Sequence, residues 1–185
     1  MINLKEKYKK EAIPTMMKQF GYKSKMAVPK IEKVVVNCGF GRMVAGKSAS
    51  EQKKVYEAIL ADLASICGQK AFLTVSKKSI AAFKIRKGMI LGAAVTLRKE
   101  KMISFLERLL NITLPRSRDF RGLDAKSFDN SGNLTIGIKE QIIFPEISPE
   151  NIKFFFGLEA VIATSAKKKE EGVALLRLLG FPIKQ

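Results

Sequence analysis

An eight-residue segment of the chain has the spacing of a phosphate-binding loop. Residues 41–48 read Gly-Arg-Met-Val-Ala-Gly-Lys-Ser, which fits the pattern G-x-x-x-x-G-K-S/T. A predicted strand precedes them, and a predicted helix begins at Ser48. In a nucleotide-binding protein, the backbone N–H groups of such a loop surround the phosphates, and Lys47 would reach the β and γ oxygens. One hypothesis is therefore a P-loop-like nucleotide-binding protein.

Other features of the sequence argue against nucleotide hydrolysis. Magnesium also needs an acid at the end of an apolar strand, but Asp62 lies in a helical pattern, and the strands predicted over residues 71–76 and 89–98 end in bases. P-loop folds use a parallel sheet, whereas these two strands are hairpin-like neighbours. The chain has no histidine, the usual general base and commonest metal ligand. We predict no enzymatic activity and no cofactor, and a basic loop at 41–48 whose amides and Lys47 meet an RNA phosphate.

A basic window without acids covers residues 63–99. Average composition would place about three acids in a window of this length, but it has none. It has eight basic residues: Lys70, Lys77, Lys78, Lys84, Arg86, Lys87, Arg98 and Lys99. Apolar residues alternate with these charges, so the window can pack into a fold and still present positive charge. Binding of a phosphate backbone requires both properties.

The composition favours a nucleic acid as the partner. The chain has 185 residues, 46% of them hydrophobic, and a formal net charge of +17, which suits one globular domain with an anionic partner. The charge lies along the whole chain rather than on one amphipathic helix, which disfavours a membrane surface. No apolar run reaches the ~20 residues of a membrane span, and the N-terminus resembles no targeting signal. We expect a cytoplasmic protein, with an organelle that makes it locally as the alternative.

The two cysteines leave two interpretations. Cys38 and Cys67 are far apart and form no C-x-x-C motif. Two structural thiols in a reducing compartment is the favoured interpretation, and a single disulfide is the alternative.

Hydrophobic periodicity predicts the element order α-β-α-β-β-α-β-β-α. The expected helices, caps included, cover residues 3–21, 48–68, 101–111 and 170–179, and the expected strands cover residues 31–37, 71–76, 89–98, 134–138 and 158–164. Pro14 should kink or split the first helix, and Pro115 should close the unit that contains the third. We predict a single α+β domain over residues 1–185, with a five-stranded, mixed, mainly antiparallel sheet and helices packed on one side in two layers. Residues 116–133 should form a long, exposed and partly ordered loop.

One face of this sheet should stay open. On the strands at 71–76 and 89–98, alternate side chains point away from the helices. The short polar groups of Thr74, Ser76 and Thr96 could there approach RNA sugars and phosphates, and a merely hydrated face is the alternative. Phe83, in the connecting basic loop, either stacks on a base or anchors the loop. Residues 154–156, three phenylalanines, are predicted to be core.

Several segments resemble the bacterial L5 family of large-subunit ribosomal proteins. They lie at residues 8–9, 28–33, 37–39, 68–70, 77–88, 95–98, 115–123, 127–129, 132–133 and 139–147, in the order expected for the family. Examples are Gly68-Gln69-Lys70, Ser127-Phe128-Asp129 and Gly132-Asn133. The chain differs from the family at residues 41–48 and at Pro14.

The resemblance implies a role in the central protuberance of the ribosome. Members bind 5S rRNA and fix it to the large subunit and its rRNA, touch peptidyl-site tRNA through a basic loop, and contact a small-subunit protein across an intersubunit bridge. Asn37, Gln69 and Thr96 match the family's polar 5S contacts. The predicted 5S rRNA site is Asn37, Gln69, Lys70, Thr74, Ser76 and Thr96. The predicted tRNA-contacting loop residues are Lys77, Lys78, Ser79, Phe83, Lys84, Arg86 and Lys87.

The remaining expectations follow from the same resemblance. The bridge is assigned to loops within residues 116–145, and the protein should be a monomer within the ribosome, with no metal. Apart from the nucleotide-binding hypothesis, the alternatives are a free RNA chaperone and a basic partner of an acidic protein. Asn37 and Gln69 each carry an amide that can read base edges or a 2′-hydroxyl.

Overall fold

The longest helix, α4 (Ala49–Cys67), begins and ends at local signals. The Ser48 hydroxyl accepts a hydrogen bond from the Glu51 N–H, and the Glu51 carboxylate accepts one from the Ser48 N–H, which is the predicted capping box. Gly68, with φ of 62°, ends the helix in the left-handed conformation. The buried stripe is the predicted one: Val55, Ile59, Leu63 and Ile66.

The computed structural model describes residues 3–118 and 120–184.

Five strands form an antiparallel sheet in the order β2-β3-β1-β5-β4. Their bounds are β1 Ile31–Gly39, β2 Phe72–Val75, β3 Ile90–Leu97, β4 Leu134–Ile138 and β5 Leu158–Thr164. Each lies within two residues of the predicted strand, and the α+β fold class is confirmed. Phe72 pairs with Ala94 and Thr74 pairs with Gly92, after which the register shifts.

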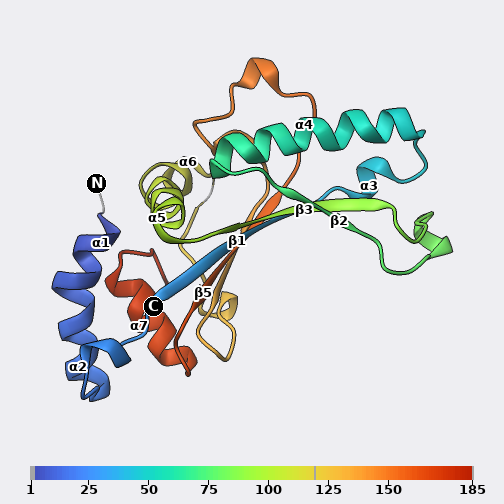
Figure 1. The fold of residues 1–185 in the computed structure, drawn as a ribbon. Coiled ribbons are helices and arrows are strands. Elements are labelled where there is room, and N and C mark those ends of the chain that lie inside the picture. Colours follow the sequence, from blue (N-terminus) through green and yellow to red (C-terminus); the bar gives the residue numbers. More distant parts are fainter. Residues whose placement is uncertain (1–2, 119, 185) are drawn as a thin grey trace. The chain divides into compact units, whose positions relative to one another are not determined.

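The chain divides into two compact units. Unit 1 is Met1–Val34, Arg98–Ile136 and Val161–Gln185, and unit 2 is Val35–Leu97 and Gly137–Ala160. A single-domain organisation stays a prediction. In unit 2, α4 packs on β3, and Figure 1 shows the helix running along β2 and β3.

Proline positions in unit 1 coincide with π-helical turns. The first helical region runs without a break through α1 (Leu4–Lys7), a π-turn (Tyr8–Ala12) and α2 (Ile13–Phe20), so Pro14 does not split the helix, and the alternative, a kink at Pro14, stays a prediction. The Ile13 N–H donates to the Tyr8 carbonyl, five residues back, immediately before the proline that has no N–H to donate. Gly21, with φ of 69°, then ends α2 as predicted.

The same arrangement occurs at Pro115, where the predicted helix end is wrong. The helix α5 (Lys99–Arg108) continues through a π-turn (Leu109–Thr113) into α6 (Leu114–Arg116). The Leu114 N–H donates to the Leu109 carbonyl, so the chain stays helical up to and through the proline. Proline at the start of a helical turn needs no partner for its missing N–H.

Residues 116–133 are largely exposed, as predicted, but two buried side chains anchor them. These are Leu123 and Phe128, 7% and 5% exposed. Downstream, the Asp129 carboxylate accepts hydrogen bonds from Ser131 N–H (2.9 Å) and from Asn133 N–H (2.8 Å). Burial alone would raise the pKa of Asp129, but these hydrogen bonds outweigh it and lower that pKa. The resemblance segment around Asp129 is thus a closed turn.

Gly132 lies very close to the backbone of a helix in unit 1. It has φ of 79° and faces Gly172 on α7 (Lys169–Leu178). A Cβ built on Gly172 would lie 2.3 Å from the Gly132 carbonyl oxygen. The helix and the turn therefore pack backbone against backbone.

Candidate nucleic-acid interface

The open face of the sheet, in unit 2, carries short side chains. Paired residues in an antiparallel ladder point to the same side, so Phe72 and Thr74 share a face with Gly92, Ala94 and, by alternation, Thr96. Phe72 is 57% exposed, and Thr74 and Thr96 are half-buried. This face is therefore accessible, and polar groups lie on it as predicted.

Gly92 lets three strands approach closely beneath this face. A Cβ at this position would lie 2.7 Å from both the Cys38 carbonyl oxygen and Thr74 Oγ1. Cys38 itself points to the other side of β1 and is 3% exposed, and burial raises the pKa of its thiol to about 12. Cys38 and Cys67 are both buried free thiols, which agrees with a structural role, and the reducing compartment stays a prediction.

Two predicted contact residues are joined directly. Gln69 Nε2 donates to the Thr96 carbonyl oxygen at 3.2 Å, so the side-chain amide is held beside β3. Lys70, the next residue, is exposed. The hydrogen bond fixes the position of the Gln69 amide and lowers the entropy cost of using it in binding.

Asn37 lines a hollow whose walls lack side chains at three positions. On β1, Val36 and Cys38 are buried and Asn37 is half-buried. The hollow has a volume of about 500 Å³, and its other lining residues are three glycines, two apolar residues and one charge of each sign: Gly39, Gly137, Gly157, Ile138, Leu158, Lys139 and Glu159. A Cβ built on Gly39 or Gly137 would meet nothing within 4 Å. A ligand backbone could therefore come close to the strands next to Asn37.

The hydroxyl groups of Ser76 and Ser79 form hydrogen bonds with the backbone of the basic loop. The Ser76 hydroxyl donates to the Lys78 carbonyl oxygen at 2.5 Å, and Ser79 Oγ accepts a hydrogen bond from the Lys87 N–H at 2.9 Å. Ser76 was predicted as an RNA contact and Ser79 as a tRNA contact. Both roles stay predictions, and both hydroxyls also hold the shape of the loop.

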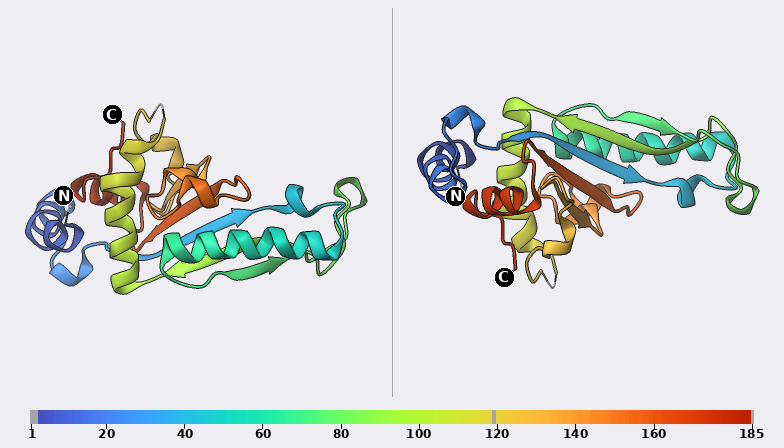
Figure 2. Two further views of the ribbon diagram at one scale, coloured as in Figure 1. Left: turned by 90° about the horizontal axis from the view of Figure 1, so that it is seen from above. Right: turned by 90° about the horizontal axis from the view of Figure 1, so that it is seen from below.

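The basic loop, residues 77–88, is a closed hairpin. The backbones of Ile80 and Ile85 exchange two hydrogen bonds, of 2.9 and 3.1 Å. Lys84 has φ of 55°, in the left-handed region, where the tight turn at residues 81–84 requires it. The predicted tRNA-contacting residues Lys77, Lys78, Ser79, Phe83, Lys84, Arg86 and Lys87 are all exposed. Figure 2 shows this loop (green) beside the start of α4.

Residues 41–48 do not form a phosphate-binding loop. The short helix α3 (Gly41–Val44) occupies the first half of the segment. The N–H groups of Ala45, Lys47 and Ser48 already donate to the carbonyls of Gly41 and Val44 and to the Glu51 carboxylate. These three amides are already used, which argues against the nucleotide-binding hypothesis, and the predicted amide contacts to RNA stay a prediction. Lys47 Nζ lies 6.0 Å above the centre of the Phe154 ring.

Comparison with known proteins decides the family. A model described as Ribosomal protein L5 matches residues 24–86, and a second model, which describes the C-terminus of the same ribosomal protein family, matches residues 90–183. The large ribosomal subunit protein uL5 of Geotalea daltonii is 49% identical over 184 residues, which cover 100% of this chain and 99% of that protein. Proteins of the same name from Clostridium botulinum (51% over 185 residues, 100% of both chains) and Caldanaerobacter subterraneus subsp. tengcongensis (52% over 182 residues, 98% of both) are equally similar.

This chain belongs to the L5 family of ribosomal proteins. It is a structural constituent of the large ribosomal subunit, without enzymatic activity, and works with the ribosome and its rRNA in the cytoplasm. Within residues 3–118 and 120–184, no helix has both the length and the apolar character to cross a bilayer. The same residues contain no cluster of three potential metal ligands.

One feature of this L5 protein was not predicted. Of the three consecutive phenylalanines expected in the core, Phe156 is 5% exposed but Phe155 is 65% exposed. Gln141, fully buried, donates to the Phe154 carbonyl (2.6 Å) and accepts from the Phe156 N–H (2.9 Å). The alternation of an extended segment was the available signal, since it turns the middle residue away from its neighbours.

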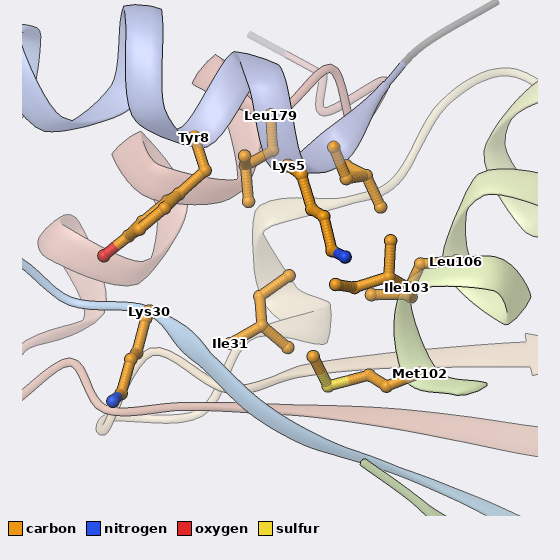
Figure 3. Close-up of a pocket in the computed structure, with 9 residues that line it drawn as sticks. Lys5, Tyr8, Lys30, Ile31, Met102, Ile103, Leu106 and Leu179 are labelled. Carbon is orange, nitrogen blue, oxygen red and sulfur yellow. The ribbon is translucent and has the colours of Figure 1, made fainter. Parts of the chain in front are cut away.

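A second cavity, in unit 1, has a different character. It has a volume of about 210 Å³ and lies between α1 and α5. Figure 3 shows apolar side chains such as Ile31, Met102 and Leu106 around it, with the Lys5 side chain extending among them. Lys5 is paired with Glu100, and Tyr8 donates to the Pro29 carbonyl at 3.2 Å. Its lining is mainly apolar, so it adds nothing to an RNA interface.

Proposed function

We propose that this L5 protein binds 5S rRNA through the open face and thereby holds that RNA in the central protuberance. The observation that carries the proposal is the grouping of the family-matching polar residues on one accessible side of β1 and β3. Gln69 is hydrogen-bonded to the Thr96 backbone, and Asn37 lies beside a glycine-lined hollow. The acid-free window of residues 63–99 includes all of β2 and β3, so no carboxylate there repels phosphates.

The mechanism is recognition of RNA shape by short, positioned groups. The minor groove of an RNA helix is wide and shallow and displays 2′-hydroxyls. The amides of Asn37 and Gln69 and the hydroxyl of Thr96 offer both donors and acceptors to such a surface. Because Gly39 and Gly137 have no side chains, a sugar–phosphate backbone can reach the strands themselves.

The basic loop is proposed to contact peptidyl-site tRNA. Its cations are long, exposed and carried on a hairpin that closes on its own hydrogen bonds. Contacts of this kind supply affinity mainly through charge, which suits a tRNA that must arrive and leave. Residues 116–145 are proposed to contribute to the bridge with a small-subunit protein.

A triple substitution tests the 5S rRNA site. Replacing Asn37, Gln69 and Thr96 with alanine removes three hydrogen-bonding groups, worth about 0.5–1.5 kcal/mol each. The Kd for 5S rRNA in a filter-binding assay should rise roughly 10- to 1000-fold, with the urea unfolding midpoint nearly unchanged. The control is Gln19, Ser50 and Ser65 to alanine, exposed positions on α2 and α4. Unchanged affinity of the first variant would remove the open face from the proposal.

Sedimentation separates the proposed role from its alternatives. An integral large-subunit protein should travel with that subunit on a sucrose gradient at high magnesium. A free RNA chaperone would spread through the light fractions, and a basic partner of an acidic protein would co-migrate with that protein instead.

A further inference from the structure

Two hollows of similar size adjoin each other in unit 2. The first, of about 700 Å³, is lined by Lys47, Lys84 and Arg86 among others. The second, of about 710 Å³, is lined by Arg42, Phe83 and Phe155 among others. Ile85 lines both, so the two share a wall. Among the described residues that line them there is no Asp or Glu.

The first hollow gathers cations from segments far apart in sequence. Lys84 and Arg86 come from the basic loop, and Lys47 from the turn before α4. Gln52 Nε2 donates to the Lys47 carbonyl at 2.8 Å and so holds that turn against the helix. Glu51 lies in the same turn, but its carboxylate accepts hydrogen bonds from the Ser48 N–H (3.0 Å) and hydroxyl (2.6 Å). The capping box holds this carboxylate at the start of α4, where its hydrogen bonds to Ser48 lower its pKa and it stays charged near Lys47.

The second hollow presents aromatic faces to solvent. Phe83 is 66% exposed and Phe155 is 65% exposed. Neither is needed to fill a core, and both are held by the backbone around them: Lys84 in its left-handed turn, and Gln141 bonded on either side of Phe155. Exposed aromatic rings next to a cationic groove are the combination that binds single-stranded nucleic acid.

We propose that an unpaired RNA segment binds across these two hollows. Its phosphates lie at Lys47, Lys84 and Arg86, and its bases stack on Phe83 and Phe155, with Arg42 beside them. An RNA duplex does not fit this arrangement, because its base faces are covered by stacking, and only unpaired bases can lie on a ring. This inference rests on the proposed RNA-binding function. It shares its loop residues with the proposed tRNA contact, keeps the RNA contact predicted for Lys47, and adds Arg42 and Phe155.

Binding of a fluorescent hexauridylate, measured by anisotropy at low salt, tests whether RNA bases stack on the exposed phenylalanine rings. Base–aromatic stacking predicts that Phe155→Leu, which keeps an apolar side chain, weakens binding about 5-fold or more. Phe155→Tyr keeps an aromatic face and should bind within 2-fold of the unsubstituted chain. Equal binding by the Leu and Tyr variants would overturn stacking at Phe155.

Two lysine substitutions, one in the proposed site and one outside it, test whether RNA phosphates bind at Lys47. Lys47→Ala and Lys54→Ala remove the same charge from nearby positions, but Lys54 is an exposed residue that lines neither hollow. Lys47→Ala should weaken hexauridylate binding at least 3-fold more than Lys54→Ala. Equal losses would mean that net charge alone attracts the RNA and would overturn the site. Equally tight binding of hexaglutamate would also overturn it, in favour of an acidic peptide.

The 5S rRNA assay, run in parallel on the unsubstituted chain, separates the two proposals. Hexauridylate binding without 5S rRNA binding would leave the hollows as an RNA site and refute the open face. The reverse result would refute the hollows and leave the open face intact.

Discussion

The acid-free window contains the basic loop and the β2 and β3 part of the open face, but the two regions hold their polar groups differently. On the open face, the groups are short, half-buried and attached to strands, and Gln69 is fixed by a hydrogen bond to Thr96. In the loop, the charged groups are long and exposed, and only the backbone is fixed. The first arrangement can distinguish one RNA shape from another, whereas the second supplies attraction that depends on salt. Net charge alone therefore does not identify which surface gives specificity.

The largest expected difference between the two regions is in the loss of unfolding free energy when a glycine is replaced. Gly92→Ala forces a Cβ to within 2.7 Å of β1 and of Thr74, and should lower the free energy of unfolding by about 2–4 kcal/mol. Gly88→Ala in the loop has φ of 84° but meets nothing within 4 Å, so about 1–2 kcal/mol is expected. Urea unfolding of both variants measures this. A Gly92→Ala cost below that of Gly88→Ala would mean that the strands can move apart.

Loop charges should control the salt dependence of tRNA binding. Replacing Lys84, Arg86 and Lys87 with alanine should reduce the slope of log K against log salt by about 2–3, since each phosphate contact contributes roughly 0.7–0.9. The charge-matched control replaces Lys18, Lys23 and Lys25, exposed residues of unit 1. The open-face triple variant should leave this slope unchanged. If the control lowers the slope as much as the loop variant does, tRNA binding is not localised to the loop.

Filling the hollow beside Asn37 should weaken 5S rRNA binding without unfolding the protein. Gly137→Val adds a β-branched side chain on β4 where a Cβ meets nothing within 4 Å, and strands favour such residues. The Kd for 5S rRNA should rise about 10-fold, or ~1.4 kcal/mol, with no loss in the urea midpoint. A folded variant with unchanged affinity would show that RNA does not enter this hollow.

The smallest expected effect concerns Cys38, on the buried side of the strand that carries Asn37. Its pKa is raised by burial from 9.0 to about 12, so the folded state retains the thiol proton more strongly than the unfolded state does. The resulting stabilisation is complete below pH 9 and is lost as the pH rises toward 12, by at most about 1.4 kcal/mol per pH unit. Cys38→Ala should flatten the fall in unfolding free energy between pH 8 and pH 10.

A loop substitution provides the control for that measurement. Ser79→Ala changes no titrating group, so its stability should follow the unsubstituted chain in parallel over the same pH range. A Cys38→Ala curve that is also parallel would mean that water reaches the buried side of β1.

Features encoded by adjacent residues were predictable from the sequence. Ser48 and Glu51 define the start of α4, and Gly21 and Gly68 end their helices, because caps depend on residues within one turn. Hydrophobic patterns within single segments predicted all five strands. The shape of residues 41–48 was not predictable from the motif alone, because the amides of that segment bond to carbonyls of its own helical turn.

Contacts between distant residues account for the remaining differences. The exposure of Phe155 depends on Gln141, which is more than ten residues earlier in the chain. The Pro115 turn stays helical because of an i to i+5 hydrogen bond that no spacing rule signals. The meeting of Gln69 with Thr96 required β3 to return beside the end of α4, so only the resemblance placed both in one site.

The hydrogen bonds between the Gln141 side chain and the backbone around Phe155 affect how the exposed surface at Phe155 can change. The Gln141 side chain is hydrogen-bonded to the backbone of residues 154 and 156. The backbone at residue 155 is therefore held in place without its own side chain, which makes little contribution to folding. Substitutions there could alter which bases are preferred while the scaffold stays intact, making position 155 a suitable starting point for engineering altered ligand selectivity.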